Sequence, residues 1–380
     1  MKISNAVTSL LSECTRVRRD LHKIPETAFT EVKTQRYILD YLEKLRPDSI
    51  ETLALTGVKA VFYAENPQKT IALRADIDAL DTTESNDTDY KSEHIGKMHG
   101  CGHDGHITML LMTARLIAAS RDKLKYNIVL LFQPGEEGRG GAKRMIADKA
   151  LENPLVDVIY GCHLWPAIEK GKLGVRWGVQ MAQTCELDFT VHGLSAHGAS
   201  PQMGVDAVVA AAEFISILQT AITRSVDPHQ DALLTIGRIS GGTARNIISD
   251  KVEMNATIRV LKPEVYTTLM NRIEAIAEGI GLALGAKFEI NELMQYPSVN
   301  NPRPLVEDFY SYAPMEDIVL IEPSMAGEDF AFYQKKIDGL FFFLGIGGGK
   351  NKFPLHNDKF DFDEDALLYG IEVYSKILGL

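Results

Sequence analysis

The chain has 380 residues, of which 45% are hydrophobic and 24% are charged, and its formal net charge is −11. This length predicts two domains, or one large domain with an insertion, and the composition is ordinary for a folded globular protein. The acidic balance excludes the basic footprint of a nucleic-acid-binding protein, and no apolar run approaches the roughly 18 residues that cross a bilayer.

The first forty or so residues have an amphipathic helical pattern that is broken at Pro25. They lack a compact apolar stretch followed by a small-residue cleavage site, so we expect no signal peptide. The four cysteines, Cys14, Cys101, Cys162 and Cys185, show no disulfide-framework spacing. We therefore expect reduced cysteines in a cytoplasmic protein, where a special cysteine is a ligand or a nucleophile.

Strands alternate with helical or polar segments through the first part of the chain. We predict strands at 59–63, 70–74, 127–132 and 156–162, a polar loop at 81–97 and a long apolar helix at 105–120. The last of these strands is expected to end at His163. Such alternation predicts an α/β fold with a mixed, largely parallel sheet flanked by helices.

The pattern changes near residue 178. Strands with alternating polarity are predicted at 184–192, 233–239 and 251–260, with amphipathic helices at 206–223 and 263–284. This order is typical of a small α+β sandwich of an antiparallel sheet and two helices. We therefore place an inserted domain at 179–290, within a first domain formed by residues 1–178 and 291–380. A proline-rich linker at 296–304 would lead back, and 341–344 would form a last buried strand.

The sequence MHGCGHDGH, at residues 98–106, is the sharpest chemical motif. One glycine separates Cys101 from His103, at the junction of a loop and a helix. Thiolate and imidazole ligands suit zinc and other divalent metals, and glycines let the backbone turn so that both side chains converge. A chance histidine-rich loop with a buried cysteine is the alternative, and the motif by itself leaves both open.

Two adjacent carboxylates, Glu136 and Glu137, follow a buried strand in the sequence QPGEEG. Neighbouring side chains at a strand end point to different sides, so one carboxylate can bind metal while the other acts as a general base. An isolated Glu-Glu pair is most often a solvated turn. The position of this pair at the carboxyl end of an apolar strand favours a role in a catalytic or metal-binding site.

Two further histidines also follow predicted strands: His163 comes after the strand at 156–162, and His356 comes after the glycine-rich loop that follows the strand at 341–344. A single histidine is usually a surface or core residue. Several strand-end or loop positions that each offer a ligand type support a metal site far more strongly together than separately.

Six motifs occur along the chain in the order RADIDAL (74–80), MHGCGHDGH, QPGEEG, HLWP (163–166), GEDF (327–330) and FPLHND (353–358). In this order they resemble the motifs of the M20 metallopeptidase family, in particular its amidohydrolase branch of N-acyl-amino-acid deacetylases, hippurate hydrolases and indole-acetyl-amino-acid hydrolases. The resemblance spans nearly the whole chain. Residues 321–344 are especially similar to bacterial N-acetyldiaminopimelate deacetylases.

The resemblance implies two divalent metal ions per subunit, with manganese, zinc, nickel or cobalt as candidates. Glu136 matches the family's general base, and Asp76 matches a carboxylate that orients the site. The inferred metal ligands are Cys101, His103, Glu137, His163 and His356.

The inserted domain matches the family's dimerisation or lid domain. His197 then corresponds to a histidine that reaches the active site of the partner subunit and stabilises the oxyanion. Asn246 and Arg259 correspond to residues that grip a substrate carboxylate, and Gly327 lies at the substrate-binding segment. On the residues alone, His197 reads as a turn histidine and Arg259 as a surface charge.

The function implied is metal-dependent hydrolysis of the amide bond of N-acyl amino acids, through a metal-activated water with Glu136 as base. We expect a small-molecule substrate, a homodimer, and no nucleic-acid or membrane partner. A dipeptidase or carboxypeptidase of the same family is the first alternative. A binding protein on a retired enzyme fold is the second, although every matched ligand and the base are present.

The sequence departs from the branch at three positions, and none of them removes a ligand. Gly100 and Gly135 stand where alanine is common, and Asp81 stands where proline is common, which leaves the entry loop and the substrate preference open. We expect His99 and His106 to be supporting or helical residues rather than ligands.

Overall fold

The computed structural model describes residues 1–349 and 352–380. The chain divides into two compact units, which we call the first and second unit. The second unit extends past the predicted boundary at 290 because a further strand, β13 (Lys287–Tyr296), pairs with β8 (Gln183–His192). The first unit comprises Met1–Gln180, Asn300–Glu322 and Asp329–Leu380, and the second comprises Met181–Val299 and Pro323–Glu328.

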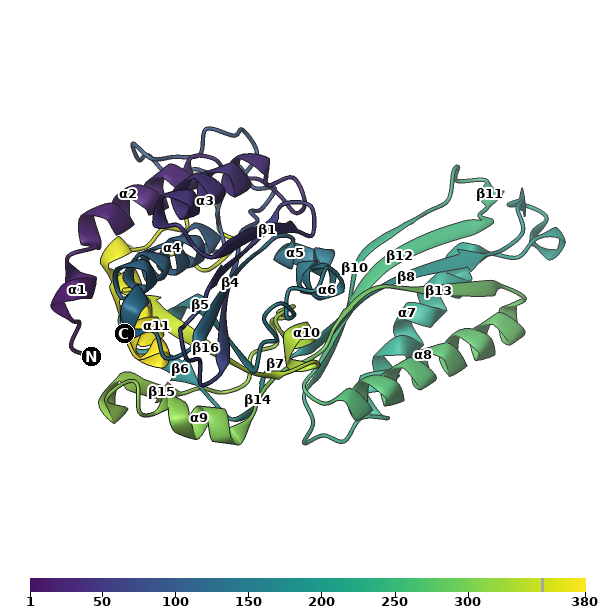
Figure 1. Cartoon of the computed structure of the whole chain (residues 1–380). Helices are drawn as coiled ribbons and strands as arrows, with labels where there is room; N and C mark the ends of the chain where they lie inside the picture. The colour runs from purple at the N-terminus through teal and green to yellow at the C-terminus, as the bar shows by residue number, and fades with distance from the viewer. Residues whose placement is uncertain (350–351) are drawn as a thin grey trace. The chain divides into compact units, whose positions relative to one another are not determined.

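An eight-stranded sheet forms the centre of the first unit (Figure 1). Its middle strands β4, β3, β5 and β16 are parallel neighbours, whereas β1, β2 and β6 add antiparallel pairings. The predicted mixed, largely parallel sheet is therefore confirmed. In spatial order the strands are β1 (Ser49–Leu53), β2 (Gly57–Phe62), β4 (Asn127–Gln133), β3 (Thr70–Asp76), β5 (Val158–Glu169), β16 (Asp338–Gly347), β6 (Leu173–Val175) and β15 (Ile318–Leu320).

The strand predicted at 156–162 does not end at His163. Residues beyond it continue to pair with β16, with Leu164 opposite Leu344 and Trp165 opposite Gly345. His163 therefore lies within β5, with strand on both sides of it.

Helices flank this sheet, as predicted. The apolar helix α4 contacts β3 and is covered by α2, α3 and α11 (Figure 1), while α6 and α10 contact β4 and β16. Because the central strands are buried along almost their whole length, they carry continuous apolar runs rather than alternating ones. The helices are α1 (Asn5–Thr8), α2 (Leu11–His22), α3 (Val32–Leu45), α4 (His103–Ala119), α5 (Glu136–Arg139), α6 (Gly141–Ala147), α9 (Arg303–Phe309), α10 (Ala331–Gln334) and α11 (Leu367–Leu378).

The second unit is an antiparallel sheet of order β10-β12-β8-β13 with two helices packed against it. Alternate residues of β8 and β12 are buried, and these face the helices. The predicted α+β sandwich is confirmed. Its other elements are α7 (Ala207–Thr223), α8 (Pro263–Leu284), β10 (Ala232–Gly241), β12 (Lys251–Val260) and the short pair β9 (Ala196–His197) and β11 (Ile247–Ile248), while β7 (Gly178–Met181) and β14 (Val299–Asn301) connect the units.

Within the described part of the chain, no helix combines the length and the apolar character needed to cross a membrane.

A buried ion-pair network fixes the start of α4 in the first unit. Nε of Arg18 lies 2.9 Å from Oδ2 of Asp104, and Nδ1 of His22 lies 2.7 Å from the same oxygen. Arg18 also pairs with Asp361 at 2.9 Å. Burial opposes ionisation of Asp104, but Arg18 and His22 outweigh it and hold the pKa of this carboxyl far below its usual range.

We expect Asp104→Asn to destabilise the protein by about 3 kcal/mol, because it leaves Arg18 buried with one fewer counter-charge. The measurement is urea unfolding, with Asp40→Asn as control. Asp40 pairs with Arg36 on the exposed face of α3, and its loss should cost less than about 1 kcal/mol.

The stabilisation that Asp104 contributes depends on pH in a definite direction. Because the folded pKa of Asp104 is depressed, its stabilisation is complete above the unfolded pKa of about 4 and is lost as the pH falls below it. The difference in the free energy of unfolding between wild type and Asp104→Asn should therefore become smaller as the pH falls below about 4. A constant difference down to pH 3 would contradict this assignment.

Candidate metal centre

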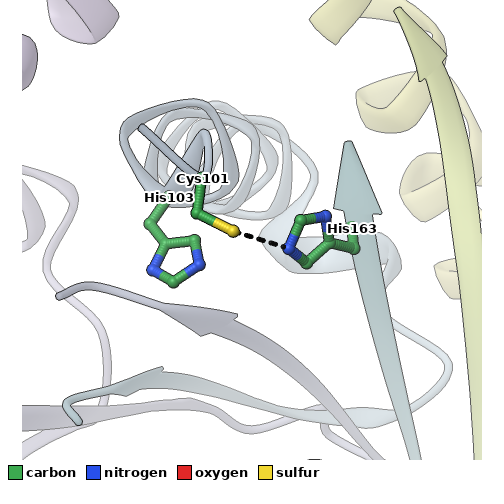
Figure 2. A group of neighbouring side chains, drawn as sticks. All are labelled: Cys101, His103 and His163. Atoms are coloured by element: carbon green, nitrogen blue, oxygen red, sulfur yellow. Dashed lines mark hydrogen bonds between the residues drawn. The ribbon is translucent and has the colours of Figure 1, made fainter. Parts of the chain in front are cut away.

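Side chains from four separate segments of the first unit meet near the carboxyl ends of its parallel strands. Figure 2 shows Sγ of Cys101, just before α4, facing Nε2 of His163 in β5 at a distance of 3.4 Å. His356, after β16, brings its Nε2 to 3.3 Å from the same sulfur and 3.3 Å from Oε1 of Glu137. Ligand atoms of Cys101, His103 and His163 lie within 4.8 Å of one another, as do those of Cys101, Glu137 and His356. The structure thus brings the five predicted ligands together in two groups that share one sulfur.

Two left-handed backbone conformations make this convergence possible. Gly102, between Cys101 and His103, has φ +83° and precedes the first turn of α4. His356 has φ +65°, which is costly for a residue with a side chain. Its N–H donates to the carbonyl of Gly100 at 2.8 Å, which ties the last predicted ligand to the loop of the first.

Hydrogen bonds orient two of the imidazoles with one nitrogen turned toward the centre. Nδ1 of His103 lies 2.8 Å from the backbone carbonyl of Asp78, and Nδ1 of His163 lies 2.8 Å from that of Leu164. A carbonyl only accepts, so each Nδ1 carries a proton and Nε2 is the nitrogen through which each ring can bind a metal. Nε2 of His103 is buried and has no hydrogen-bond partner among the described residues. This orphaned nitrogen, beside a thiol and carboxylates, fits the donor set of a divalent metal pair.

Glu136 and Glu137 enter the site directly after β4. Glu136 is buried, and its carboxylate lies within 4.8 Å of the ligand atoms of His103 and Glu137. The N–H of Glu137 donates to Oδ2 of Asp78 at 2.9 Å. Burial opposes ionisation of Glu137, but His356 and His103 hold the pKa of its carboxyl below the usual range. Glu137 is therefore a carboxylate at neutral pH, as a metal ligand must be.

Asp76 lies beside the proposed ligands, with a carboxylate oxygen within 4.8 Å of ring nitrogens of His103 and His106. Nη1 of Arg74 is 2.7 Å from its Oδ2, and Nδ1 of His106 contacts its Oδ1. The backbone N–H of Leu164 donates to Nε2 of His106 at 3.0 Å. Since His106 uses both ring nitrogens in these hydrogen bonds, its position agrees with the prediction of a supporting residue.

The sequence analysis missed several residues that hold this arrangement. Asp78 orients His103 through its carbonyl and Glu137 through its carboxylate, although it lies only two residues after Asp76. Asp329, in the GEDF motif, accepts from Nη2 of Arg74 at 2.8 Å and from Nε2 of Gln133 at 2.8 Å. Asp78 and Gln133 are buried at or just after strand ends, and that position was the signal available in the sequence, whereas Asp329 lies in a turn before α10.

The remaining predicted residues belong to the second unit. His197 pairs with Ile247 in the β9–β11 ribbon and is exposed, and the carbonyl of Asn246 accepts from Gly198 at 2.8 Å. Arg259, in β12, donates through Nη1 to the carbonyl of Met325 at 2.9 Å.

Within this unit the four predicted residues form two separate pairs. His197 and Asn246 adjoin one another at the β9–β11 ribbon. This ribbon follows the end of the sheet where Lys251 pairs with His192, whereas Arg259 pairs with Thr184 at the opposite end. Gly327 lies beside Arg259, because a Cβ at Gly327 would meet Thr184 at 2.7 Å. A single second unit therefore does not gather all four around one small molecule.

Fold and site together define a metal-dependent hydrolase. The sequence pattern of Peptidase family M20/M25/M40 matches residues 72–379, and the chain belongs to this family. The predicted family and the predicted class, a metal-dependent amidohydrolase, are confirmed.

Relatives and solved structures agree with this assignment over nearly the full length. N-acetyldiaminopimelate deacetylase of Priestia megaterium is 37% identical over 96% of this chain and 97% of its own, and that of Listeria innocua is 36% identical over 97% and 99%. A Bacillus subtilis dinuclear metal-binding peptidase of the M20 family has a TM-score of 0.83 at 32% identity, covering 98% of this chain and 99% of its own. A Staphylococcus aureus protein assigned as an aminohydrolase has a TM-score of 0.91 at 30% identity, covering 98% and 97%.

Metal loading should release protons, and metal affinity should rise with pH. Burial, with Glu137 and Glu136 nearby, raises the pKa of the Cys101 thiol. Burial would lower the pKa of His103, but Asp76 and Asp78 raise it to about 10. Both groups therefore hold a proton near pH 7 that a metal ligand cannot keep. Affinity should increase about tenfold per pH unit for each proton released.

Calorimetric titration of the metal-free protein in two buffers of different ionisation enthalpy measures this release. Cys101→Ala is the control, because it should release one proton fewer. Equal heats in both buffers for the wild type would mean that metal binding releases no net proton, and would exclude Cys101 and His103 as ligands.

Proposed function

We propose that the protein hydrolyses the amide bond of N-acyl amino acids, and that N-acetyldiaminopimelate is its substrate. The observation that carries the proposal is the buried Glu136 carboxylate, placed beside the ligand atoms of His103 and Glu137. The choice of substrate is supported by deacetylase relatives that are 36–38% identical over nearly the whole chain.

The metal ions, when bound, would polarise the acyl carbonyl and lower the pKa of a water molecule in the site. Glu136 takes a proton from the attacking water and delivers it to the amine nitrogen as the C–N bond breaks, so that the amino acid leaves as a neutral amine. Cys101, His103, Glu137, His163 and His356 are the proposed ligands. Asp78 orients two of them, because its carbonyl accepts from His103 and its carboxylate accepts from the amide of Glu137. Asp76 would support the site through its hydrogen bond with His106.

For the metal itself we propose zinc, since the Cys101 thiolate is a soft ligand. Manganese, nickel and cobalt also suit a set that includes the Glu137 carboxylate, and metal analysis of the active protein distinguishes them. All four cysteines are free and buried, which supports a reducing compartment, and we place the protein in the cytoplasm.

We further propose that the protein acts as a homodimer. His197 and Asn246 would come from one subunit, while Arg259 and Gly327 would come from the subunit that holds the substrate. The separation of these pairs within one second unit supports this arrangement. His197 would donate to the developing oxyanion, and Asn246 with Arg259 would bind the carboxylate of the amino acid.

The substrate proposal is tested by assaying the metal-loaded protein on acetyl, benzoyl and aminoacyl derivatives of the same amino acids. We expect the N-acetyl compounds, and N-acetyldiaminopimelate above all, to be hydrolysed with the highest kcat/KM. Faster cleavage of the aminoacyl compounds would identify a dipeptidase instead.

Glu136→Gln should retain its metal but lose at least about a hundredfold in kcat, because it removes the base. Full activity in this variant would refute the assignment of Glu136.

The shared site predicts complementation between two inactive variants. Subunits carrying Glu136→Gln and subunits carrying His197→Ala should each be inactive as homodimers. A mixed dimer contains one site with both native residues, so an equal, random mixture should recover about a quarter of wild-type activity. Co-expression with two affinity tags provides the mixed dimers. Absence of recovery in purified mixed dimers would show that His197 does not act across subunits.

A further inference from the structure

Glu31 occupies an N-cap position but does not cap its helix. It precedes α3, and its side chain makes no capping hydrogen bond. The amides of Lys33 and Thr34, which an N-cap carboxylate normally satisfies, donate instead to Oε2 of Glu26 at 2.8 and 3.0 Å. The carboxylate of Glu31 is thus available for another contact.

That contact is with the segment that carries the proposed base. Oε1 of Glu31 accepts from the backbone N–H of Gly135 at 3.1 Å, and its Oε2 accepts from Oγ1 of Thr56 at 2.5 Å. Glu31 is completely buried. Burial raises its pKa to about 7, with the Thr56 hydrogen bond opposing and Asp78 adding to the rise. Ionisation of a carboxylate that is buried in this way is costly, which argues for a role of Glu31 beyond packing.

The same short segment also contacts Gly135 through an aromatic ring. Phe29 lies two residues before Glu31, and a Cβ at Gly135 would meet the Phe29 ring at 2.9 Å. Gly135 has φ +65°, so its conformation depends on the absence of a side chain. One segment therefore fixes both the amide and the α-carbon of the residue that precedes Glu136.

The residue that follows Glu136 is fixed in the same way from the other side. The N–H of Glu137 donates to Oδ2 of Asp78 at 2.9 Å. Buried carboxylates thus hold the backbone amides on both sides of Glu136, whereas only Asp78 also touches a metal-ligand histidine.

We propose that Glu31 is a positioning residue for Glu136, an inference that rests on the proposed role of Glu136 as the base. By holding the amide of Gly135, Glu31 sets the direction in which the next side chain enters the site. Displacement of a catalytic group by about 1 Å can cost on the order of a hundredfold in rate. Metal ligation should be little affected, because the contacts of Cys101, His103 and His163 do not involve Glu31.

The test compares Glu31→Ala with Glu26→Ala. Both remove a buried carboxylate that accepts backbone amides, and the two residues lie in the same loop. We expect Glu31→Ala to lower kcat at least about tenfold, with KM and metal content within about twofold of wild type. Glu26→Ala should lower the melting temperature but leave kcat within about twofold. Equal loss of kcat in both variants, or none in Glu31→Ala, would overturn the proposal.

Hydrogen exchange gives a readout that needs no substrate. The peptide covering 133–140 should exchange faster in Glu31→Ala than in wild type, and Glu26→Ala should leave it unchanged. Wild-type protein that hydrolyses none of the acyl compounds would refute the proposed function, while the exchange result would still decide whether Glu31 holds this segment. Unchanged exchange in Glu31→Ala would overturn the positioning role.

Glu31→Gln keeps the experiment decisive if the alanine variant does not fold. A neutral amide oxygen is a weaker acceptor than a carboxylate, so this variant should show faster exchange at 133–140 and a smaller loss of kcat, about threefold. Wild-type exchange and wild-type kcat in Glu31→Gln would contradict the proposal.

Discussion

The sulfur of Cys101 is the contact on which the site depends, because it meets imidazoles from two distant parts of the chain. His163 approaches it at 3.4 Å and His356 at 3.3 Å. The two groups of ligand atoms therefore share one atom. The first group needs α4 and β5 in place, and the second needs the segment after β4 and the loop after β16. The second unit is inserted in the sequence between β5 and β16. The ligands therefore come together only when the segments of the first unit before and after this insertion have folded together.

Paired charges beside the ligands stabilise this convergence of polar side chains in a buried environment. Arg74 bridges Asp76 and Asp329, and Asp76 in turn contacts His106. Each buried carboxylate has a cation, an imidazole or an amide as partner, as a low-dielectric interior requires. The ligands consequently sit on groups that are themselves fixed, which is the arrangement that holds metal-binding imidazoles in one tautomer and one orientation.

Much of this site was predictable from residue type and place in the chain. Cys101, His103, Glu136 and Glu137 were candidates because their residue types follow an apolar strand or precede a helix, and the family resemblance then assigned their roles as ligands and base. Asp78 was missed because it orients His103 through its backbone carbonyl, which any residue type could supply, and because the contact of its carboxylate with the amide of Glu137 depends on the fold. The grouping of Arg259 apart from Asn246 depends on strand register, which one sequence does not reveal. Strand β13 escaped prediction because, as an edge strand, it is mostly exposed and lacks a clear apolar alternation.

The close approach of Phe29 to Gly135 links two positions far apart in the sequence. The family resemblance places Gly135 where alanine is expected in the amidohydrolase branch. With the Phe29 ring 2.9 Å from the place of a Cβ, an added methyl group does not fit here unless the ring moves or residue 29 becomes smaller. We therefore expect positions 29 and 135 to vary together among related sequences. Glycine at position 135 should accompany a large aromatic ring at position 29, and this pair would mark one subgroup.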